Sequence, residues 1–378
     1  MATSAPFKDR IHPDGIGALG RALAEAWQVE GVDFDPADFV AQATAGLQAL
    51  ELKARVVQVA DAVQASLPAD QSPEVVARVV QRASGPALVS AEGLTDGFGV
   101  WPLLTWVERH GLDHPAVSLA LLRQLTKRFS AEFAVRPYLE GHPELAWAAV
   151  HGWVADENVH VRRLASEGTR PRLPWGGHLR ASIKDPSLSI TVLDKLVDDP
   201  ERYVQRSVAN HLGDLAKDHP ELAVQTARRW LDDGGNEGRA WIVRHGLRHL
   251  VKKGHKGALA VLGFGPPKVE LRAFDVHSPV VLLGERLEVS LELASTSSRP
   301  QKLVIDLAVH FLKKNGQLRP KVFKWTTRTL KAGTVLQQPR SQPLKAVSTR
   351  THNTGTHRVE LLVNGESMAI RDFELVVG

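Results

Sequence analysis

The chain has 378 residues, of which 47 are Lys or Arg and 42 are Asp or Glu, so the net charge is only +5. It contains no cysteine, which excludes disulfides, thiolate metal ligands and cysteine nucleophiles and fits a reducing compartment. A hydrophobic content of 43% with 24% charged residues is typical of a globular protein. No apolar run approaches the roughly 18 residues of a membrane helix, and the first residues lack a signal-peptide core. We therefore expect a cytoplasmic protein, neither secreted nor bound to a membrane.

The positive charge is concentrated in the C-terminal third. Residues 266–378 hold 17 basic and 10 acidic residues, a net charge of +7, whereas residues 1–265 hold 30 basic and 32 acidic residues, a net charge of −2. From Arg299 to Arg350 there are 12 basic residues and a single acid, Asp306. Such segregation predicts a surface in this third that faces a polyanion.

Up to about residue 262 the hydrophobic pattern has the period of a helix. Apolar residues recur at i, i+3 and i+4, and Pro, Gly, Asp and Ser stand where helices begin and end. The expected helices cover residues 15–28, 36–49, 50–66, 73–82, 115–129, 131–139, 143–155, 157–167, 190–197, 204–216 and 239–253.

Two internal similarities indicate a helical repeat. The segment that starts at Asp156 matches the one that starts at Asp199, an offset of 43, and HPELA occurs at both His142 and His219, an offset of 77. These offsets correspond to one and two units of roughly 40 residues, the period of HEAT or armadillo helix pairs. Stacked pairs of this kind bury their apolar faces against their neighbours and form a solenoid with a concave surface.

The composition changes at residues 263–267 (GFGPP). Beyond them, residues 286–293, 303–311, 357–363 and 368–376 alternate apolar and polar side chains, and Asn-Gly turns lie between strand-like runs. Roughly seven short strands at this spacing indicate an immunoglobulin-like β-sandwich, here without its disulfide. The expected fold is therefore multidomain α plus β, with an all-α HEAT-like solenoid over 1–263 and a basic β-sandwich over 264–378.

Glu167 is unusual for its place in the predicted helix. It stands in the last turn, just before Gly168 in the C-cap position, where the helix dipole disfavours a carboxylate. A residue that breaks a local rule is a candidate functional residue. The alternative is a structural ion pair with Arg163, four residues earlier.

Two further residues accompany Glu167 as catalytic candidates. Trp175 lies on a constrained loop between Pro174 and two glycines, so it is either a buried anchor or an exposed platform for a sugar or base. Glu132 follows Ser130 near an expected helix start, a place where an acid can also be purely structural. Asp156 is expected to be an N-cap rather than a catalytic group.

Basic residues surround these acids. Such a run suits contact with phosphates, and its members are Arg162, Arg163, Arg170, Arg172 and Arg180. Farther along, His245 and His249 have a spacing that can hold a metal, but no third ligand is evident. Phosphate contact by Arg244 and His245, or simple solvation, is the better interpretation. We expect no metal site, and the sequence lacks a Walker motif, GxSxG or a dinucleotide-binding fingerprint.

The basic residues of the C-terminal third cluster where the strand pattern lapses. One group is expected around a turn and comprises Lys313, Lys314, Arg319, Lys321, Lys324 and Arg328. A second is expected in a Pro/Gln/Ser-rich loop and comprises Arg340, Lys345 and Arg350. Loops at one end of a sandwich often carry binding residues, so these side chains are candidates for DNA contact. A solvated face that keeps the module soluble is the alternative.

Several strings resemble one protein family. SAEFAVRPYL, HVRRLASEGTRPRLPW, SVANHLGDLAKDHPE and WIVRHGLRHLVKKGHKGAL are similar to the AlkC branch of the AlkC/AlkD superfamily of HEAT-like DNA glycosylases. The resemblance spans about residues 7–263, and the C-terminal third resembles the immunoglobulin-like extension found in a subset of that branch.

The resemblance implies a function and a site. The family excises cationic N3-alkylated bases, chiefly 3-methyladenine, from double-stranded DNA without flipping the base, and Glu132, Glu167 and Trp175 fall on its active-site positions. It implies a monofunctional glycosylase for 3-methyladenine, with 3-methylcytosine as a second candidate substrate, acting without a cofactor as a monomer on bacterial nucleoid DNA. The rival hypothesis is a non-catalytic HEAT-repeat scaffold that binds nucleic acid. Acids beside Trp175 argue against it, because a pure scaffold has no use for carboxylates that repel phosphates.

Overall fold

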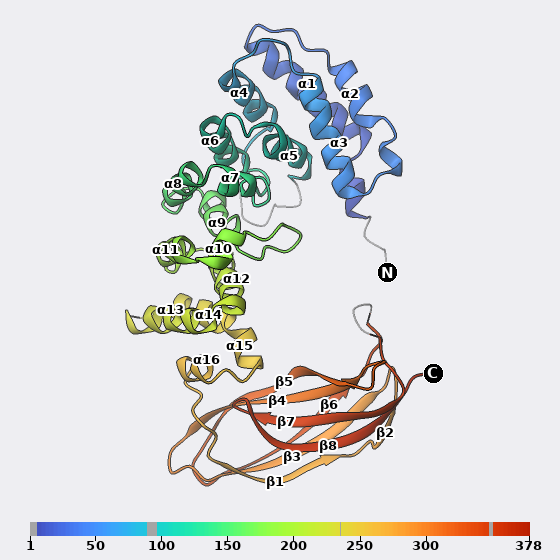
Figure 1. The fold of residues 1–378 in the computed structure, drawn as a ribbon, viewed down its shortest axis with the longest axis vertical. Helices are drawn as coiled ribbons and strands as arrows, with labels where there is room; N and C mark the ends of the chain where they lie inside the picture. Colours follow the sequence, from blue (N-terminus) through green and yellow to red (C-terminus); the bar gives the residue numbers. More distant parts are fainter. Residues whose placement is uncertain (1–5, 89–96, 235, 348–350) are drawn as a thin grey trace. The chain divides into compact units, whose positions relative to one another are not determined.

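The computed structural model describes residues 6–88, 97–234, 236–347 and 351–378, so Arg350 lies outside the described residues. The chain forms two compact units: Met1–Asp218 with Trp230–Gly246, and His219–Arg229 with Leu247–Gly378. The first unit is helical and the second carries the strands (Figure 1). In the described parts of the chain, no helix has the length and apolar character needed to cross a membrane.

The sequence of the first unit explains where its helices begin. Proline occupies one of the first two positions of α1, α2, α4, α5, α6, α7 and α8, where its missing N–H leaves no hydrogen bond unmade. Side-chain caps add to this: Asp35 accepts from the amide of Ala37 at 2.8 Å, and Asn158 accepts from that of His160 at 3.0 Å. The helix bounds are α1 Pro13–Val29, α2 Pro36–Thr44, α3 Leu52–Ala65, α4 Pro73–Ala83, α5 Trp101–His110, α6 Pro115–Leu125, α7 Arg136–Gly141, α8 Pro143–Trp153, α9 Val159–Glu167, α10 Arg180–Lys184, α11 Ser187–Leu196, α12 Arg202–Asp218 and α14 Glu237–Gly246. The helix α13, Pro220–Asp232, belongs mostly to the second unit.

These helices stack as a HEAT-like array. In one row α1 packs on α4, α4 on α6 and α6 on α8; in the other α3 packs on α5, α9 on α12 and α12 on α14 (Figure 1). Each helix pair therefore buries its apolar side against the next, as the repeat in the sequence predicts. The candidate site residues lie in the turn after α6 of the first row, on α9 of the second row and in the loop that follows α9.

Some predicted helices differ from those observed. The predicted helix 131–139 is a turn followed by α7, and the predicted helix 239–253 is two helices, α14 and α15 (Arg248–Lys252). The break falls at Gly246, where a Cβ atom would lie 2.7 Å from Leu212 Cδ2. The helices α5, α10, α13 and α16 (Lys256–Val261) were not predicted. α5 is buried on most sides, so it lacks the one-sided apolar pattern of an amphipathic helix.

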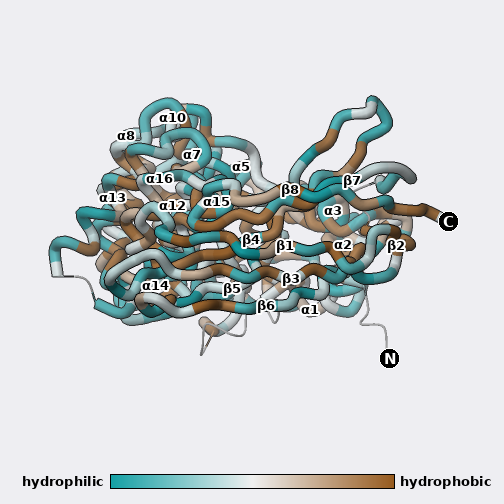
Figure 2. The backbone as a smooth tube through the Cα atoms, turned by 90° about the horizontal axis from the view of Figure 1, so that it is seen from below, coloured by the Kyte–Doolittle hydropathy of each residue, from teal (hydrophilic) through white to brown (hydrophobic). Residues whose placement is uncertain are grey.

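The strands of the second unit form two sheets, in the orders β1-β3-β6 and β2-β8-β7-β4-β5. The predicted strands 286–293, 303–311, 357–363 and 368–376 are confirmed as parts of β3, β4, β7 and β8. Inward-facing side chains from both sheets form an apolar core, and hydrophobic and hydrophilic residues alternate along the strands (Figure 2). The bounds are β1 Val269–Val276, β2 Val280–Leu282, β3 Arg286–Ser295, β4 Gln301–Leu312, β5 Leu318–Leu330, β6 Val335–Pro343, β7 Gly355–Val363 and β8 Glu366–Val376.

The placement of the C-terminal basic residues in loops is partly wrong. Lys313 and Lys314 do lie in the turn between β4 and β5, and Lys345 lies outside the strands. The other described members lie on strands: Arg319, Lys321, Lys324 and Arg328 on β5, and Arg340 on β6. β5 is the edge of its sheet and pairs only with β4 among the described strands. An edge strand tolerates charged residues because its outer side meets solvent, and this obscures the alternating pattern.

Candidate active site

Glu132 and Glu167 are brought together by Arg163. Nη1 of Arg163 donates to Oε2 of Glu132 at 2.9 Å, and Nη2 of the same guanidinium lies 3.6 Å from Oε1 of Glu167. Glu132 comes from the turn after α6, while Arg163 and Glu167 are one turn apart on α9. The structure thus joins two carboxylates that are 35 positions apart in the sequence.

Glu167 has further partners on its inner side. Arg170 donates to Oε1 of Glu167 at 2.6 Å, and the hydroxyl of Ser207, on α12, donates to Oε2 at 2.5 Å. Burial alone would raise the pKa of Glu167, but the charges of Arg163 and Arg170 and the bond from Ser207 together lower it. Glu167 therefore stays ionised at neutral pH although its side chain is only 8% exposed.

The arginine between the carboxylates is itself enclosed. Burial would lower the pKa of Arg163, but the charges of Glu167 and Glu132 raise it, so the group stays a cation. Its guanidinium also lies over the ring of Tyr203, 4.9 Å from the centroid. The Glu132 side chain is 17% exposed, about twice the fraction of Glu167, so Glu132 is the more open carboxylate of the pair.

Trp175 lies on the loop between α9 and α10 and is 76% exposed. The buried-anchor alternative is therefore wrong for this side chain. Its backbone has φ +65°, in the left-handed region that favours glycine, so the loop is strained where it presents the indole. Strain at an exposed aromatic residue is typical of a functional position rather than of a packing role.

Two cations hold this loop, and neither was predicted. Lys53, on α3, donates to the carbonyl oxygen of Trp175 at 3.0 Å. Arg136, at the start of α7, donates to the carbonyl oxygens of Gly168 and Arg170, at 3.0 and 2.9 Å, and to that of Gly177. The sequence signal for Arg136 was an arginine in the otherwise apolar run that follows Glu132, within SAEFAVRPYL.

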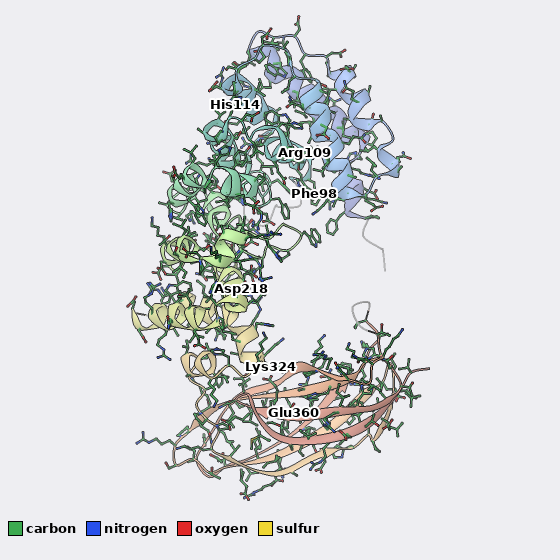
Figure 3. All side chains as sticks on the ribbon, in the orientation of Figure 1. Phe98, Arg109, His114, Asp218, Lys324 and Glu360 are labelled. Atoms are coloured by element: carbon green, nitrogen blue, oxygen red, sulfur yellow. The ribbon has the colours of Figure 1, made fainter. Side chains whose placement is uncertain are left out.

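A cavity of about 370 Å³ borders the same loop. Its wall includes aromatic residues and carboxylates of α5 and α7, with Arg109 at the end of α5 (labelled in Figure 3). Burial raises the pKa of Glu108 in this wall, an effect that the charges of Arg109 and Lys53 only partly offset. The Trp175 loop faces this cavity and not a packed core, so hydrogen bonds and not side-chain packing must fix its conformation on that side. Residues that line the cavity include Lys53, Trp101, Glu108, Arg109, Phe133, Arg136, Glu140 and Trp175.

Most of the arginines proposed to contact phosphates are engaged in internal ion pairs. Arg162 pairs with Asp199 at 2.6 Å, and Arg172 pairs with Asp218 at 2.6 Å. Arg170 is buried between Glu167 and Asp214, and Arg163 is the link between the two catalytic candidates. These contacts give the four side chains structural or site-forming roles. Arg180, on α10, is exposed, and its side chain makes no hydrogen bond or ion pair within the described residues, so it can still reach a phosphate.

Two residues predicted to contact phosphates, Arg244 and His245, lie near the end of the first unit. Arg244 is exposed, while His245 stacks on Trp241 with ring centroids 4.9 Å apart. The guanidinium of Arg202 also lies over Trp241, 4.2 Å from the ring centroid. His249 lies on α15 rather than α14, and in the described parts of the chain no three His, Cys, Asp or Glu residues are grouped to hold a metal ion.

Asp156 is not the N-cap of α9, contrary to expectation. That position belongs to Asn158, whose side chain accepts from the amide of His160. Asp156 instead accepts from the amide of Asn158 at 2.9 Å and pairs with Arg123 at 2.5 Å. It therefore stabilises the turn that precedes the helix.

The basic residues of the second unit follow one edge of its larger sheet. Arg319, Lys321, Lys324 and Arg328 are exposed on β5, and Lys314 is exposed in the turn before it. Figure 3 labels Lys324 on this strand. Lys324 is opposite Asp306 in the β4–β5 register, and burial raises the pKa of Asp306 to about 6 despite the charges of Lys324, Lys252 and Arg340. The exposed cations of β5 make this edge positive.

Comparison with known proteins gives two family matches. Residues 128–250 match the family described as "DNA alkylation repair enzyme", and residues 270–377 match "Uncharacterised protein YhaZ, C-terminal Ig-like domain". The first range contains Glu132, Glu167 and Trp175, and the second contains the basic edge strand β5.

Individual relatives agree with these families. The chain is 39% identical over 271 residues to "Uncharacterized protein YhaZ" of Bacillus subtilis (strain 168), covering 71% of this chain and 75% of that protein. A solved structure of the alkylpurine DNA glycosylase AlkC from Pseudomonas fluorescens, bound to DNA containing an abasic site analog, matches with a TM-score of 0.84 and 36% identity. That match covers 98% of this chain and 99% of the other.

Proposed function

The chain belongs to the AlkC family of DNA alkylation repair proteins, and on that premise we propose that it is a glycosylase for cationic N3-alkylated bases in double-stranded DNA. Its substrate is 3-methyladenine, with 3-methylcytosine as a second candidate. The similar AlkC structure is that of an alkylpurine DNA glycosylase and holds DNA with an abasic site analog, which supports both the activity and the DNA partner.

The observation that carries this proposal is the pair of carboxylates joined by Arg163. An N3-alkylated adenine already bears positive charge, so its glycosidic bond is weakened and the leaving base needs no proton. Glu167, whose pKa is lowered, cannot be a general acid at neutral pH, but it can stabilise the positive charge that develops on the sugar. To Glu132, the more exposed of the two, we assign the alignment of the attacking water.

Trp175 supplies the second part of the proposed mechanism. Its exposed indole packs against the deoxyribose of the damaged nucleotide and holds the sugar against the carboxylates. The base itself then needs no enclosing pocket and stays in the DNA stack, unlike the substrates of enzymes that flip bases.

The reaction ends at base release in this proposal. We assign no lysine as a Schiff-base nucleophile, and Lys53 donates to the carbonyl oxygen of Trp175. The product is then an intact strand with an abasic site, as expected for a monofunctional hydrolase that uses no cofactor. Exposed Arg180 and Arg244 of the first unit, and the basic edge of β5, are the groups that we propose to contact phosphates.

The test is abasic-site formation in a methylated duplex. Purified protein should produce sites that break on heating, while the same DNA stays unbroken without heating. Borohydride should trap no covalent complex. A protein that binds the duplex without forming abasic sites would instead be the non-catalytic scaffold.

A further inference from the structure

Arg136 is buried without a counter-ion. It is 6% exposed, and in the described parts of the chain no carboxylate lies within ion-pair distance of its guanidinium. Burial lowers the pKa of Arg136 to about 10, an effect only partly offset by Glu140, the most influential nearby carboxylate. A buried cation without an ion pair is costly, so its hydrogen bonds must account for its presence.

Those hydrogen bonds all go to one loop. Arg136 donates to the carbonyl oxygens of Gly168, Arg170 and Gly177. Residues 168–179 form neither helix nor strand, so their carbonyl groups lack the regular partners of secondary structure. The planar fork of the arginine replaces those partners from two separate nitrogens, Nη1 and Nη2. A lysine has its three donors on one nitrogen and does not match this fork geometry.

The three bonded carbonyls belong to the neighbours of the catalytic candidates. Gly168 directly follows Glu167, Arg170 is the ion-pair partner of Glu167, and Gly177 is two residues beyond Trp175. Arg136 itself is four residues after Glu132, and its own amide donates to the carbonyl of Phe133 at 3.1 Å. The side chain of Arg136 is thus tied to the backbone beside Glu167 and Trp175, and its own backbone lies in the turn that carries Glu132.

From this geometry we propose that Arg136 is a positioning residue, which fixes Trp175 and Glu167 relative to Glu132 without touching the DNA. The inference rests on the proposed function. Because the cavity leaves the loop unpacked on one side, the guanidinium is the main restraint on the indole, and Lys53 is a second one. Displacement of such groups by about 1 Å can cost up to about 10²-fold in rate.

Arg55 offers a matched control. It is 7% exposed and also donates to three main-chain carbonyls, those of Lys8, Leu50 and Ile11. Its acceptors lie in the N-terminal part of the unit, Lys8 and Ile11 before α1 and Leu50 before α3, and not on the Trp175 loop. Unlike Arg136, it also has a carboxylate within ion-pair distance, that of Asp9 at 3.8 Å. Arg136→Lys and Arg55→Lys should both lower thermal stability, but only Arg136→Lys should disturb the loop and the chemistry.

The experiment measures single-turnover release of 3-methyladenine at several enzyme concentrations, expressed per folded protein. Arg136→Lys should lower the rate at saturating enzyme by 10-fold or more, with the half-saturating enzyme concentration changed less than about 2-fold. Arg55→Lys should keep the wild-type rate. In a Trp175→Ala background the loss due to Arg136→Lys should shrink, because both changes act through the same ring.

A second readout does not depend on activity. In the free protein, amide hydrogen exchange over residues 168–179 should accelerate in Arg136→Lys and stay unchanged in Arg55→Lys. Lys53→Met removes the hydrogen bond that the exposed Lys53 makes to the loop, without changing a buried group. It should therefore accelerate exchange in the same segment, and it remains informative if Arg136→Lys fails to fold.

The proposal would be overturned if loop exchange were unchanged in both Arg136→Lys and Lys53→Met. If Arg136→Lys does not fold, unchanged exchange in Lys53→Met alone would overturn it. So would equal rate losses in Arg136→Lys and Arg55→Lys. If the wild-type protein releases no base, the proposed function fails instead, and the exchange data still test the restraint.

Discussion

Glu132 and Glu167 share one counter-ion: Nη1 of Arg163 is 2.9 Å from Glu132, and Nη2 is 3.6 Å from Glu167. This arrangement offsets the repulsion between the two carboxylates, because a positive charge lies between them. It also couples the two acids, because removing the charge of one leaves Arg163 to interact with the other alone.

Replacing either carboxylate by an amide should slow base release. Glu132→Gln and Glu167→Gln each remove one charge-stabilising group, for which we expect a loss of about 10²-fold in the single-turnover rate, with little loss of DNA affinity. Glu167→Gln should also lower the melting temperature more than Glu132→Gln does, because its side chain is more deeply buried.

Asp199→Asn is the control for the loss of an ion pair as such. Asp199 is buried and pairs with Arg162 at 2.6 Å. This variant should lose stability but keep its excision rate. Wild-type rates in both glutamine variants would refute the catalytic assignment.

Removing the indole of Trp175 should separate activity from stability. Trp175→Ala should slow excision, while the melting temperature changes little because the side chain is 76% exposed. Trp175→Gly should be at least as stable as Trp175→Ala, since glycine relieves the strain at φ +65°, and should be equally slow. Trp147→Ala, which removes a half-buried indole of α8, controls for the loss of an aromatic ring. A large drop in melting temperature for Trp175→Ala would favour a structural role.

Acid should destabilise the first unit through His211. This ring is fully buried on α12, and its Nδ1 lies 3.0 Å from the carbonyl oxygen of Ser166, next to Glu167. Burial lowers its pKa to about 4, an effect that Arg170 reinforces and Asp214 opposes. Between about pH 6.5 and 4 the unfolded chain therefore binds one more proton than the folded chain, so stability is complete above pH 6.5 and falls toward pH 4.

The size of this effect should be on the order of 3 kcal/mol. The free energy of unfolding of wild type and His211→Gln should be compared across this pH range. The variant should be less stable at pH 7.5 but show a shallower loss toward pH 4.5, while His178→Gln, an exposed change, should follow wild type. Parallel curves for His211→Gln and wild type would show that His211 does not take up the proton.

The basic edge of β5 should contribute to the salt dependence of DNA binding. Lys321→Gln with Lys324→Gln removes two exposed charges, so the slope of log affinity against log salt should fall by about two units. The control is Lys268→Gln with Arg371→Gln, which removes the same charge from exposed positions elsewhere in the unit and should leave this slope nearer to that of wild type. Equal slopes in wild type and the β5 variant would leave β5 as a solvated edge that merely resists pairing with other strands.

Much of the architecture could be predicted from the sequence, because helical repeats and strands both produce a regular spacing of similar or apolar residues along the chain. The offsets of 43 and 77 and the alternating strands 286–293 and 303–311 reflect contacts that recur along the chain. β5 was not predicted as a strand, because it lies at the edge of its sheet and, among the described strands, only one neighbouring strand, β4, constrains its residues.

The site was predicted less completely, since its geometry depends on long-range contacts. Glu167 stood out because it breaks a helix rule, and Trp175 because of the glycines beside it. The sequence could not show that Arg163 joins Glu132 to Glu167, or that Arg136 binds the carbonyls of the Trp175 loop. A run of arginines suggests phosphate contact, whereas ion pairs such as Arg162–Asp199 appear only once the helices are stacked.

The most direct test of the whole account is chromatographic analysis of the bases released from methylated duplex DNA by the purified protein. We predict rapid release of free 3-methyladenine by the wild-type protein, and release slowed by at least about 10²-fold by Glu132→Gln with Glu167→Gln. Wild-type protein that binds the duplex but releases no 3-methyladenine above the spontaneous rate would contradict it.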